Sequence, residues 1–167
     1  MRYGAGMQLA QVNVSRLLEP LDAPRLADFV TALDPINALA DAAAGFVWRL
    51  QTEDGDATAV RVFDDSMIII NLTVWESVDA LAAFTFRSDH AAVMRRRREW
   101  FHRLGEASTA LWWVPDGHRP TPREARERLE HLRRHGPGAH AFTFRAPFPP
   151  PGGDDVAPPA DDWLCPA

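Results

Sequence analysis

The stretch MIIINLTVW, residues 67–75, decides the fold class. β-Branched side chains dominate it, and such residues favour a pleated strand over a helix. The chain that follows, residues 76–104, changes to an apolar spacing of three and four residues, which is typical of an amphipathic helix. Ser88 is suited to cap a second helical segment, so we expect a strand that leads into a helix broken near residues 88 and 89.

Further strands and helices are expected on both sides of this unit. The alternating pattern of QLAQVNV, residues 8–14, predicts a first strand. A helix is predicted from Arg25, with Pro35 as the site of a kink or break, and another from Thr121 to about His135. The remaining predicted strands are 45–51, with Phe46, Trp48 and Leu50 on one face, a short strand at 60–63, and the segments 108–114 and 141–145.

This order of elements predicts an α+β fold of the ferredoxin-like kind, an antiparallel sheet with helices on one face. The predicted domain spans residues 7–145, and the proline-rich residues 146–167 are expected to form a flexible tail. Met7 opens the first strand directly, so the native start is expected at Met1 or Met7. Because so few helices cover only one face of a sheet, we expect a second subunit on the other face, and hence a homodimer.

The composition excludes several classes of function. The 167 residues are 46% hydrophobic and 25% charged, which fits one globular domain, and a net charge of −5 argues against nucleic acid as a partner. All 18 basic residues are arginine, which excludes a lysine Schiff base and a lysine-containing P-loop. The single cysteine, Cys165, excludes a disulfide framework. No run of apolar residues is long enough to cross a membrane or to form a signal-peptide core, so we expect a cytoplasmic protein.

The helix predicted over 76–104 carries two polar residues in its apolar stripe. Its spacing places His90 and Arg97 on one face, and an unpaired buried arginine is unfavourable by several kcal/mol. Of the run Arg95 to Arg98, one or two arginines are therefore expected to point inward to a partner. His90 and Arg97 together are suited to hold a carboxylate or enolate oxygen, and the alternative for Arg97 is an internal ion pair with Glu76.

The imidazole of His90 has three interpretations. It can act as a general base, bind haem iron as an axial ligand, or lie in the core with its ring nitrogens satisfied locally. No other metal site is expected, because His131 and His135 share a helix face without the glutamate of an HExxH motif.

Amide and aromatic side chains complete the candidate pocket. Asn13 is suited to hold a phenolate oxygen, although an amide in a strand more often binds backbone. Trp112 and Trp113 are adjacent on a strand and must face opposite sides of it. The predicted catalytic residues are His90, Arg97 and Asn13, and the predicted substrate-binding residues are Trp48, Trp75, Phe86, Asn37, Met94 and Phe101.

The segment VWESVDALAAFTFRSDH, residues 74–90, resembles the strand and helix of the dimeric α+β barrel superfamily, which includes antibiotic-biosynthesis monooxygenases and haem-degrading enzymes. Within it, the sequence is similar to the DUF3291 family. The matching words include LAQVNV, DPINALA, GFVWRLQTEDGDAT, MRRRREWF and LWWVP, and the likeness covers about residues 7–145. The resemblance implies a dimeric α+β barrel, in a superfamily that hosts several chemistries.

The sequence supports three candidate functions. The first is a cofactor-independent enzyme, monooxygenase-like or an isomerase or cyclase, acting on a hydrophobic or aromatic small molecule; the sequence contains no dinucleotide-binding fingerprint. His90 is then the base, Arg97 and Asn13 hold the oxyanion, and the tryptophans line the pocket. The second is a ligand-binding protein without catalysis. The third is a haem protein that uses His90.

Overall fold

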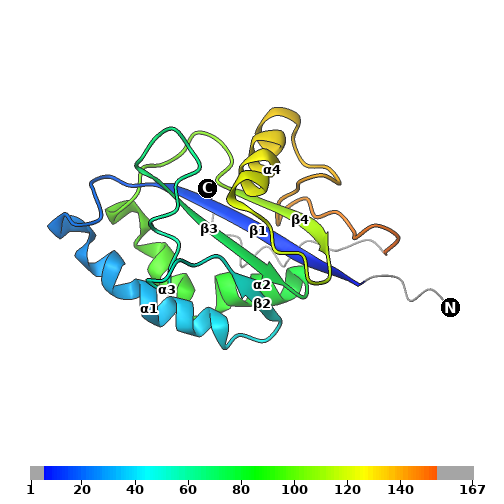
Figure 1. The fold of residues 1–167 in the computed structure, drawn as a ribbon, viewed down its shortest axis with the longest axis horizontal. Coiled ribbons are helices and arrows are strands. Elements are labelled where there is room, and N and C mark those ends of the chain that lie inside the picture. Colours follow the sequence, from blue (N-terminus) through cyan, green and yellow to red (C-terminus); the bar gives the residue numbers. More distant parts are fainter. Residues whose placement is uncertain (1–5, 154–167) are drawn as a thin grey trace.

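The computed structural model describes residues 6–153, which form one four-stranded antiparallel sheet (Figure 1). The strand order β2-β3-β1-β4 is that of a ferredoxin-like α+β fold, which confirms the predicted fold class. The strands are β1 (Met7–Arg16), β2 (Phe46–Arg49), β3 (Ile68–Trp75) and β4 (Thr109–Pro115). The helices are η1 (Pro24–Leu26), α1 (Ala27–Asp41), α2 (Val78–Arg87), α3 (His90–Arg95), η2 (Arg97–Glu99) and α4 (Pro122–His135).

Side-chain caps fix the starts of two helices. The Ser77 hydroxyl accepts a hydrogen bond from the Ala80 backbone N–H at 3.1 Å, where α2 begins. The Thr121 hydroxyl likewise accepts from the Glu124 N–H at 3.1 Å, and Gly136, with a φ of 75°, ends α4. The predicted bounds of α4 are therefore confirmed, as is the predicted break between α2 and α3.

Of the kink or break predicted at Pro35, the break is wrong, because α1 continues through this residue as one helix. Pro35 removes a hydrogen bond to the carbonyl of Thr31. Both residues are exposed, so water can bind this carbonyl and the proline ring disturbs no packing.

Two short segments form less strand than predicted. Residues 60–63 form none, and the Val60 N–H instead bonds within a turn to the Ala57 carbonyl at 3.0 Å. In the segment 141–145, backbone pairing is reduced to isolated bridges, one of which joins Phe142 to β4.

The sheet face toward α4 is closed by the chain itself. Leu129 and Leu132 of α4 pack on apolar side chains of the strands, among them Val12 and Trp112, and apolar side chains of the loop 50–67 join the same cluster. Figure 1 shows α4 on one side of the sheet and α1, α2 and α3 on the other. A second subunit is not required to cover this face, which corrects the reason given above for a homodimer. The homodimer itself stays a prediction.

The opposite face of the sheet carries two separate apolar clusters. The first joins Leu9 and Trp75 to Leu81 of α2, and the second joins Leu17 and Ile69 to residues of η1, α1 and α3 and to Trp100, which follows η2. Along β1 and β3 the residues between these clusters are polar, and they form the candidate site.

Candidate functional site

A polar belt crosses the helix-covered face of the sheet between the two apolar clusters. We define the polar belt as Gln11, Asn13, Asn71, Thr73 and Thr109. Antiparallel register places Asn13 opposite both Asn71 and Thr109, and Gln11 opposite Thr73. Because side chains alternate along a strand, all five share the face of Leu9 and Trp75.

Hydrogen bonds within the polar belt orient its amides. The Trp75 indole N–H donates to the Thr73 hydroxyl at 2.9 Å, so this hydroxyl donates in turn to Gln11 Oε1 at 2.8 Å. Asn13 Nδ2 donates to Thr109 Oγ1 at 2.8 Å. The NH₂ group of Gln11 and Oδ1 of Asn13 make no hydrogen bond within residues 6–153 and are available to a ligand.

Asn71 is the part of the polar belt that a ligand can reach. It lies in β3 opposite Asn13 of β1, past Thr73, where the pairing of β3 with β2 ends, and it is exposed. No hydrogen bond of its side chain occurs within the described chain. The helix layer therefore leaves this amide open, with both a donor and an acceptor at the level of the polar belt.

Arg49 closes the end of the polar belt beside Thr73, its partner in the register. Its side chain is only 12% exposed and donates from Nε to Asp41 Oδ1 at 2.7 Å and from Nη1 to the Gly55 carbonyl at 2.6 Å. Because Asp41 neutralises this guanidinium, the polar belt has no unpaired charge at this end. Arg49 was not among the functional residues predicted from the sequence.

Two aromatic side chains, Phe84 and Trp75, connect His90, at the first turn of α3, to the polar belt. The ring of His90 lies 5.0 Å from that of Phe84, and Phe84 stacks at 5.2 Å on Trp75, whose N–H binds Thr73. Its Nδ1 lies 3.2 Å from the Thr85 carbonyl, so Nδ1 carries the hydrogen and Nε2 the lone pair. Burial lowers the pKa of His90, and the Thr85 carbonyl opposes this in part. The imidazole is therefore neutral at neutral pH and satisfied locally at one nitrogen.

The prediction that Arg97 points inward beside His90 is wrong. Arg97 is exposed in η2, and all four residues of the run from Arg95 to Arg98 are exposed as well. α3 ends at Arg95 and the chain continues as the 3-10 helix η2, which changes the angle between successive side chains, so the spacing from His90 no longer predicts a shared face. Arg96 is the arginine that makes contacts here: it donates to Asp28 at 2.7 Å and to Glu99 at 2.8 Å.

The prediction that Trp48 lines the same pocket as Trp75 is also wrong. A register shift between Phe46 and Trp48 turns the chain by one residue, so Phe46 packs beside Trp75 while Trp48 packs on the α4 side. The predicted opposition of Trp112 and Trp113 is confirmed, because the two residues belong to the clusters on the two faces.

The other predicted binding residues are dispersed. Phe86 packs edge-on against Phe144 at 5.2 Å, and Phe101 packs edge-on against Phe29 of α1 at 5.0 Å. Asn37 and Met94 are half-buried in α1 and α3. Contact of any of these residues with a substrate stays a prediction.

The remaining expectations concern metal sites, membrane spans and the two ends of the chain. Within residues 6–153, no group of three or more His, Cys, Asp or Glu side chains is placed to hold a metal ion. None of the helices in this part of the chain is long and apolar enough to span a membrane. The predicted alternative start at Met1 and most of the predicted tail, with Cys165, lie outside the described residues.

Comparison with known proteins identifies a family. A family model described as a domain of unknown function, DUF3291, matches residues 8–158, and none of the curated proteins matches the chain. The chain is similar to SnoaB, a cofactor-independent oxygenase from Streptomyces nogalater (17% identity, 69% of this chain and 96% of that one, TM-score 0.43). It is also similar to NE2512, a protein of unknown function from Nitrosomonas europaea (16% identity, 71% of this chain and 98% of that one, TM-score 0.42). A conserved protein from Methanosarcina mazei is similar as well (12% identity, 69% of this chain and 98% of that one, TM-score 0.47). These likenesses concern the fold alone.

Proposed function

The chain belongs to the DUF3291 family, and we propose that it is an enzyme that transforms a hydrophobic or aromatic small molecule at the polar belt without a bound cofactor. The observation that carries the proposal is the open amide of Asn71 opposite Asn13, beside oriented amides and between two apolar clusters. Apolar walls with a few convergent polar groups are the usual make-up of a small-molecule site.

The polar groups fit a phenolic substrate. The NH₂ groups of Asn71 and Gln11 can donate to a phenolate oxygen, and Oδ1 of Asn13 can accept from a second hydroxyl. His90 Nε2 carries a lone pair and is the proposed base that removes the phenol proton. Arg97 and Trp48 have no part in this assignment.

Monooxygenation is the first form of the proposed reaction. Phenolate formation raises the electron density of the ring, which then reduces O₂. One oxygen atom enters the ring as a carbonyl, and the other leaves as water together with two hydrogens of the substrate. A phenol plus O₂ thus gives a quinone plus water, so no external reductant is consumed. Isomerisation or cyclisation through the same phenolate or enolate would need the same residues.

Two assays on matched amide variants test the proposal. Binding of a panel of phenolic aromatics is measured by quenching of tryptophan fluorescence, and turnover by oxygen uptake. We expect Asn71→Ala to lose binding at least several-fold and Gln8→Ala, the matched control on the α4 side of the sheet, to retain it. His90→Gln should retain binding and lose turnover. Equal binding by Asn71→Ala and wild type would refute the site.

The alternative functions give different results in the same experiment. Binding that depends on Asn71 without any turnover of the panel would favour a ligand-binding protein, for which the uncharged polar belt is equally suited. An absorbance spectrum with added haemin, recorded for wild type and His90→Ala, tests the third function. A Soret band that depends on His90 would replace the proposal with a haem protein.

A further inference from the structure

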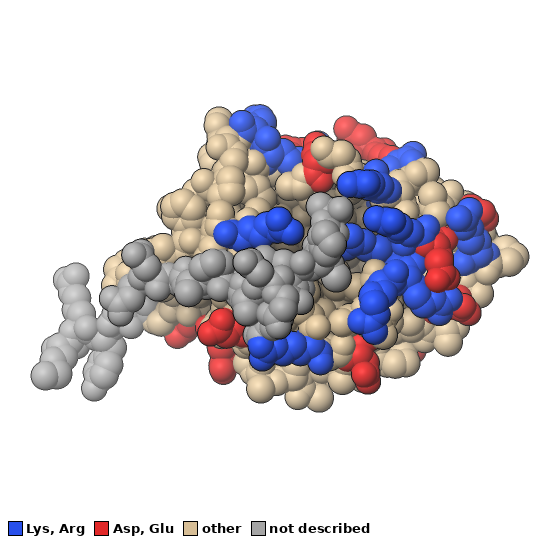
Figure 2. Space-filling view, turned by 180° about the vertical axis from the view of Figure 1, so that it is seen from behind, with Lys and Arg blue, Asp and Glu red and all other residues tan. Residues whose placement is uncertain are grey.

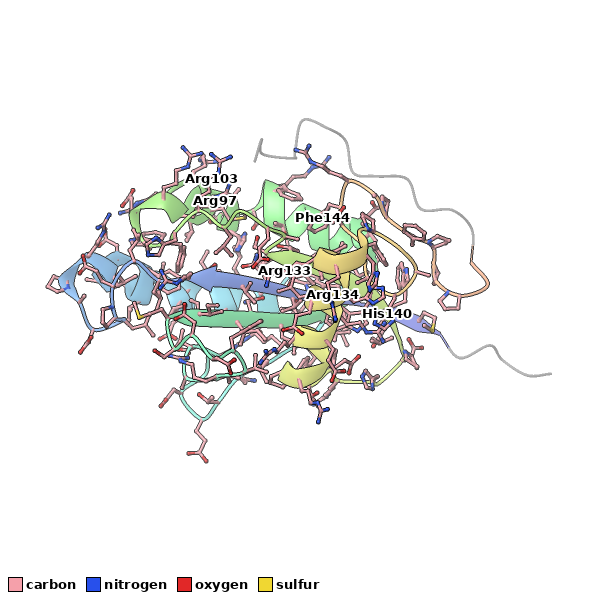
Figure 3. All side chains as sticks on the ribbon, turned by 90° about the horizontal axis from the view of Figure 1, so that it is seen from above. Arg97, Arg103, Arg133, Arg134, His140 and Phe144 are labelled. Carbon is pink, nitrogen blue, oxygen red and sulfur yellow. The ribbon has the colours of Figure 1, made fainter. Side chains whose placement is uncertain are left out.

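Three imidazole rings lie together where α4 passes into the segment that follows it. We define the histidine cluster as His131, His135 and His140. The ring centre of His131 lies 4.5 Å from that of His135, one helical turn along α4, and 4.3 Å from that of His140. Figure 3 shows His140 beside α4. Because α4 covers the face of the sheet opposite to the polar belt, the histidine cluster is separate from the site described above.

A hydrogen bond from Arg128 of α4 fixes the protonation state of His140. Arg128 Nη1 donates to the His140 carbonyl at 2.8 Å and to the ring nitrogen Nδ1 at 3.1 Å. A guanidinium has donors only, so Nδ1 must be the nitrogen that carries the lone pair. Protonation of His140 would place a hydrogen on Nδ1 and set an imidazolium against the guanidinium. This contact between α4 and the following segment therefore requires the neutral form of His140.

The two carboxylates of α4 that face this contact already have basic partners. Glu127 pairs with Arg123 at 3.0 Å, and Glu124 lies 2.8 Å from Nε2 of His118. Figure 2 shows basic and acidic side chains close together along the upper edge of the molecule, where Figure 1 places α4. β4, which lies on the other side of the segment, contains no titratable residue. Both carboxylates are therefore already engaged when a charge is added to the histidine cluster.

An added proton on the histidine cluster is unfavourable in this arrangement. Burial lowers the pKa of His131, and nearby charges lower it further. These charges are those of His135, Arg134 and Arg128. Burial also lowers the pKa of His140, to which Arg128 and His131 add, while the Glu127 carboxylate opposes the change in part. Both pKa values return toward their ordinary value when the rings separate from these neighbours, so acid favours separation.

The segment held by His140 covers the edge strand β4 and packs on α2. The Phe142 N–H donates to the Leu111 carbonyl at 2.8 Å, and the Leu111 N–H donates to the Phe142 carbonyl at 2.9 Å. Phe144 then packs edge-on against Phe86 of α2. Phe142 itself belongs to the apolar cluster that borders the polar belt beside α2. The contact between His140 and α4 therefore supports a segment that reaches the wall of the candidate site.

We propose that the histidine cluster is a pH-sensitive latch that fastens the segment 136–142 to α4. At neutral pH the uncharged ring of His140 accepts the hydrogen bond from Arg128, and the segment stays paired with β4. In mild acid the protonated rings repel Arg128 and one another, and the segment separates from α4 and from β4. The latch is a property of the fold and does not depend on the function proposed above.

Amide hydrogen exchange in the full-length protein measures the latch at two backbone bonds. The N–H groups of Leu111 and Phe142 bond to each other's carbonyls, so their protection reports whether the segment is held on β4. Observed rates are divided into the intrinsic rates at each pH, because exchange itself depends on pH. We expect protection of both amides to fall at least several-fold between about pH 7.5 and about pH 4.5, and to fall more than that of the β1 amides paired with β3. An equal loss in β1 would indicate general unfolding and overturn the proposal.

Variants that cannot be protonated distinguish the latch from other effects of acid. His140→Asn should retain protection at neutral pH and lose less of it in acid, because the asparagine oxygen can accept from Arg128 in place of Nδ1 and does not titrate. His131→Gln leaves the Arg128 contact in place and removes one site of protonation, so it should also reduce the acid loss. The matched control His118→Asn removes an imidazole outside the histidine cluster and should keep the wild-type pH dependence. An acid loss equal to that of the wild type in both His140→Asn and His131→Gln overturns the proposal.

Discussion

Replacement of Thr73 by valine removes one hydroxyl that serves two partners in the polar belt. In the wild type this hydroxyl accepts the indole N–H of Trp75 at 2.9 Å and donates to Gln11 Oε1 at 2.8 Å. Valine has nearly the same shape, so the change tests the hydrogen bonds with little change in packing.

The expected magnitude follows from the burial of the two partners. Trp75 is fully buried, and its unpaired N–H is unfavourable by about 1–3 kcal/mol. Gln11 is half-buried and can turn its carbonyl toward water, which adds at most about 1 kcal/mol. The additional buried methyl group of valine returns at most about 0.8 kcal/mol. We therefore expect Thr73→Val to lower the free energy of unfolding by about 1–3 kcal/mol.

Urea unfolding followed by circular dichroism measures this loss without relying on tryptophan emission. With a slope of about 2 kcal/mol/M, a loss of about 2 kcal/mol moves the midpoint down by about 1 M. Thr109→Val is the matched control: its hydroxyl only accepts from half-buried Asn13, and we expect a loss of about 0.5–1 kcal/mol. A loss below about 0.5 kcal/mol for Thr73→Val, or equal losses for both variants, would refute the reasoning.

Two further predictions concern stability. Gly45→Ala should be destabilising by at least about 2 kcal/mol in urea unfolding, because Gly45 has a φ of 79° and an added Cβ would lie 2.5 Å from that of Ala80. Gly55 has a φ of 86° but lies in open space, so the control Gly55→Ala should be destabilising by only about 1 kcal/mol. The lowered pKa of His90 means that the folded state binds fewer protons than the unfolded state, so stability is full above pH 6.5 and falls as the pH drops below it. His90→Gln should make this fall shallower without abolishing it, because the pKa of His131 is lowered too; an identical pH profile would contradict the assignment.

The helices and strands that were predicted correctly are those whose sequence signals lie within a few neighbouring residues. β3 was evident from its β-branched residues, and α4 from a cap, a proline at its start and a glycine at its end. The faces of Trp48 and Arg97 were predicted wrongly. The bulge in β2 and the change from α3 to the 3-10 helix η2 each alter the direction in which the later side chains point. A shift of one residue turns a side chain to the opposite face of a strand, or by about 100° on a helix.

The polar belt was only partly visible from the sequence. Polar residues stand at alternate positions of the strands, such as Gln11 with Asn13 and Asn71 with Thr73, and of these only Asn13 was predicted as a site residue. The register that brings these pairs side by side depends on contacts about 60 residues apart along the chain, which no local pattern contains.

The bulge that moved Trp48 also affects how the sheet meets other molecules. β2 is an edge strand of only four residues, interrupted at the exposed Val47, and the other edge, β4, is partly covered by the bridge to Phe142. Long, flat, unpaired edges add foreign strands and lead to aggregation, and short or bulged edges prevent this. Both edges of this sheet are therefore short or partly covered, so neither offers a long, flat template to which a foreign strand could add.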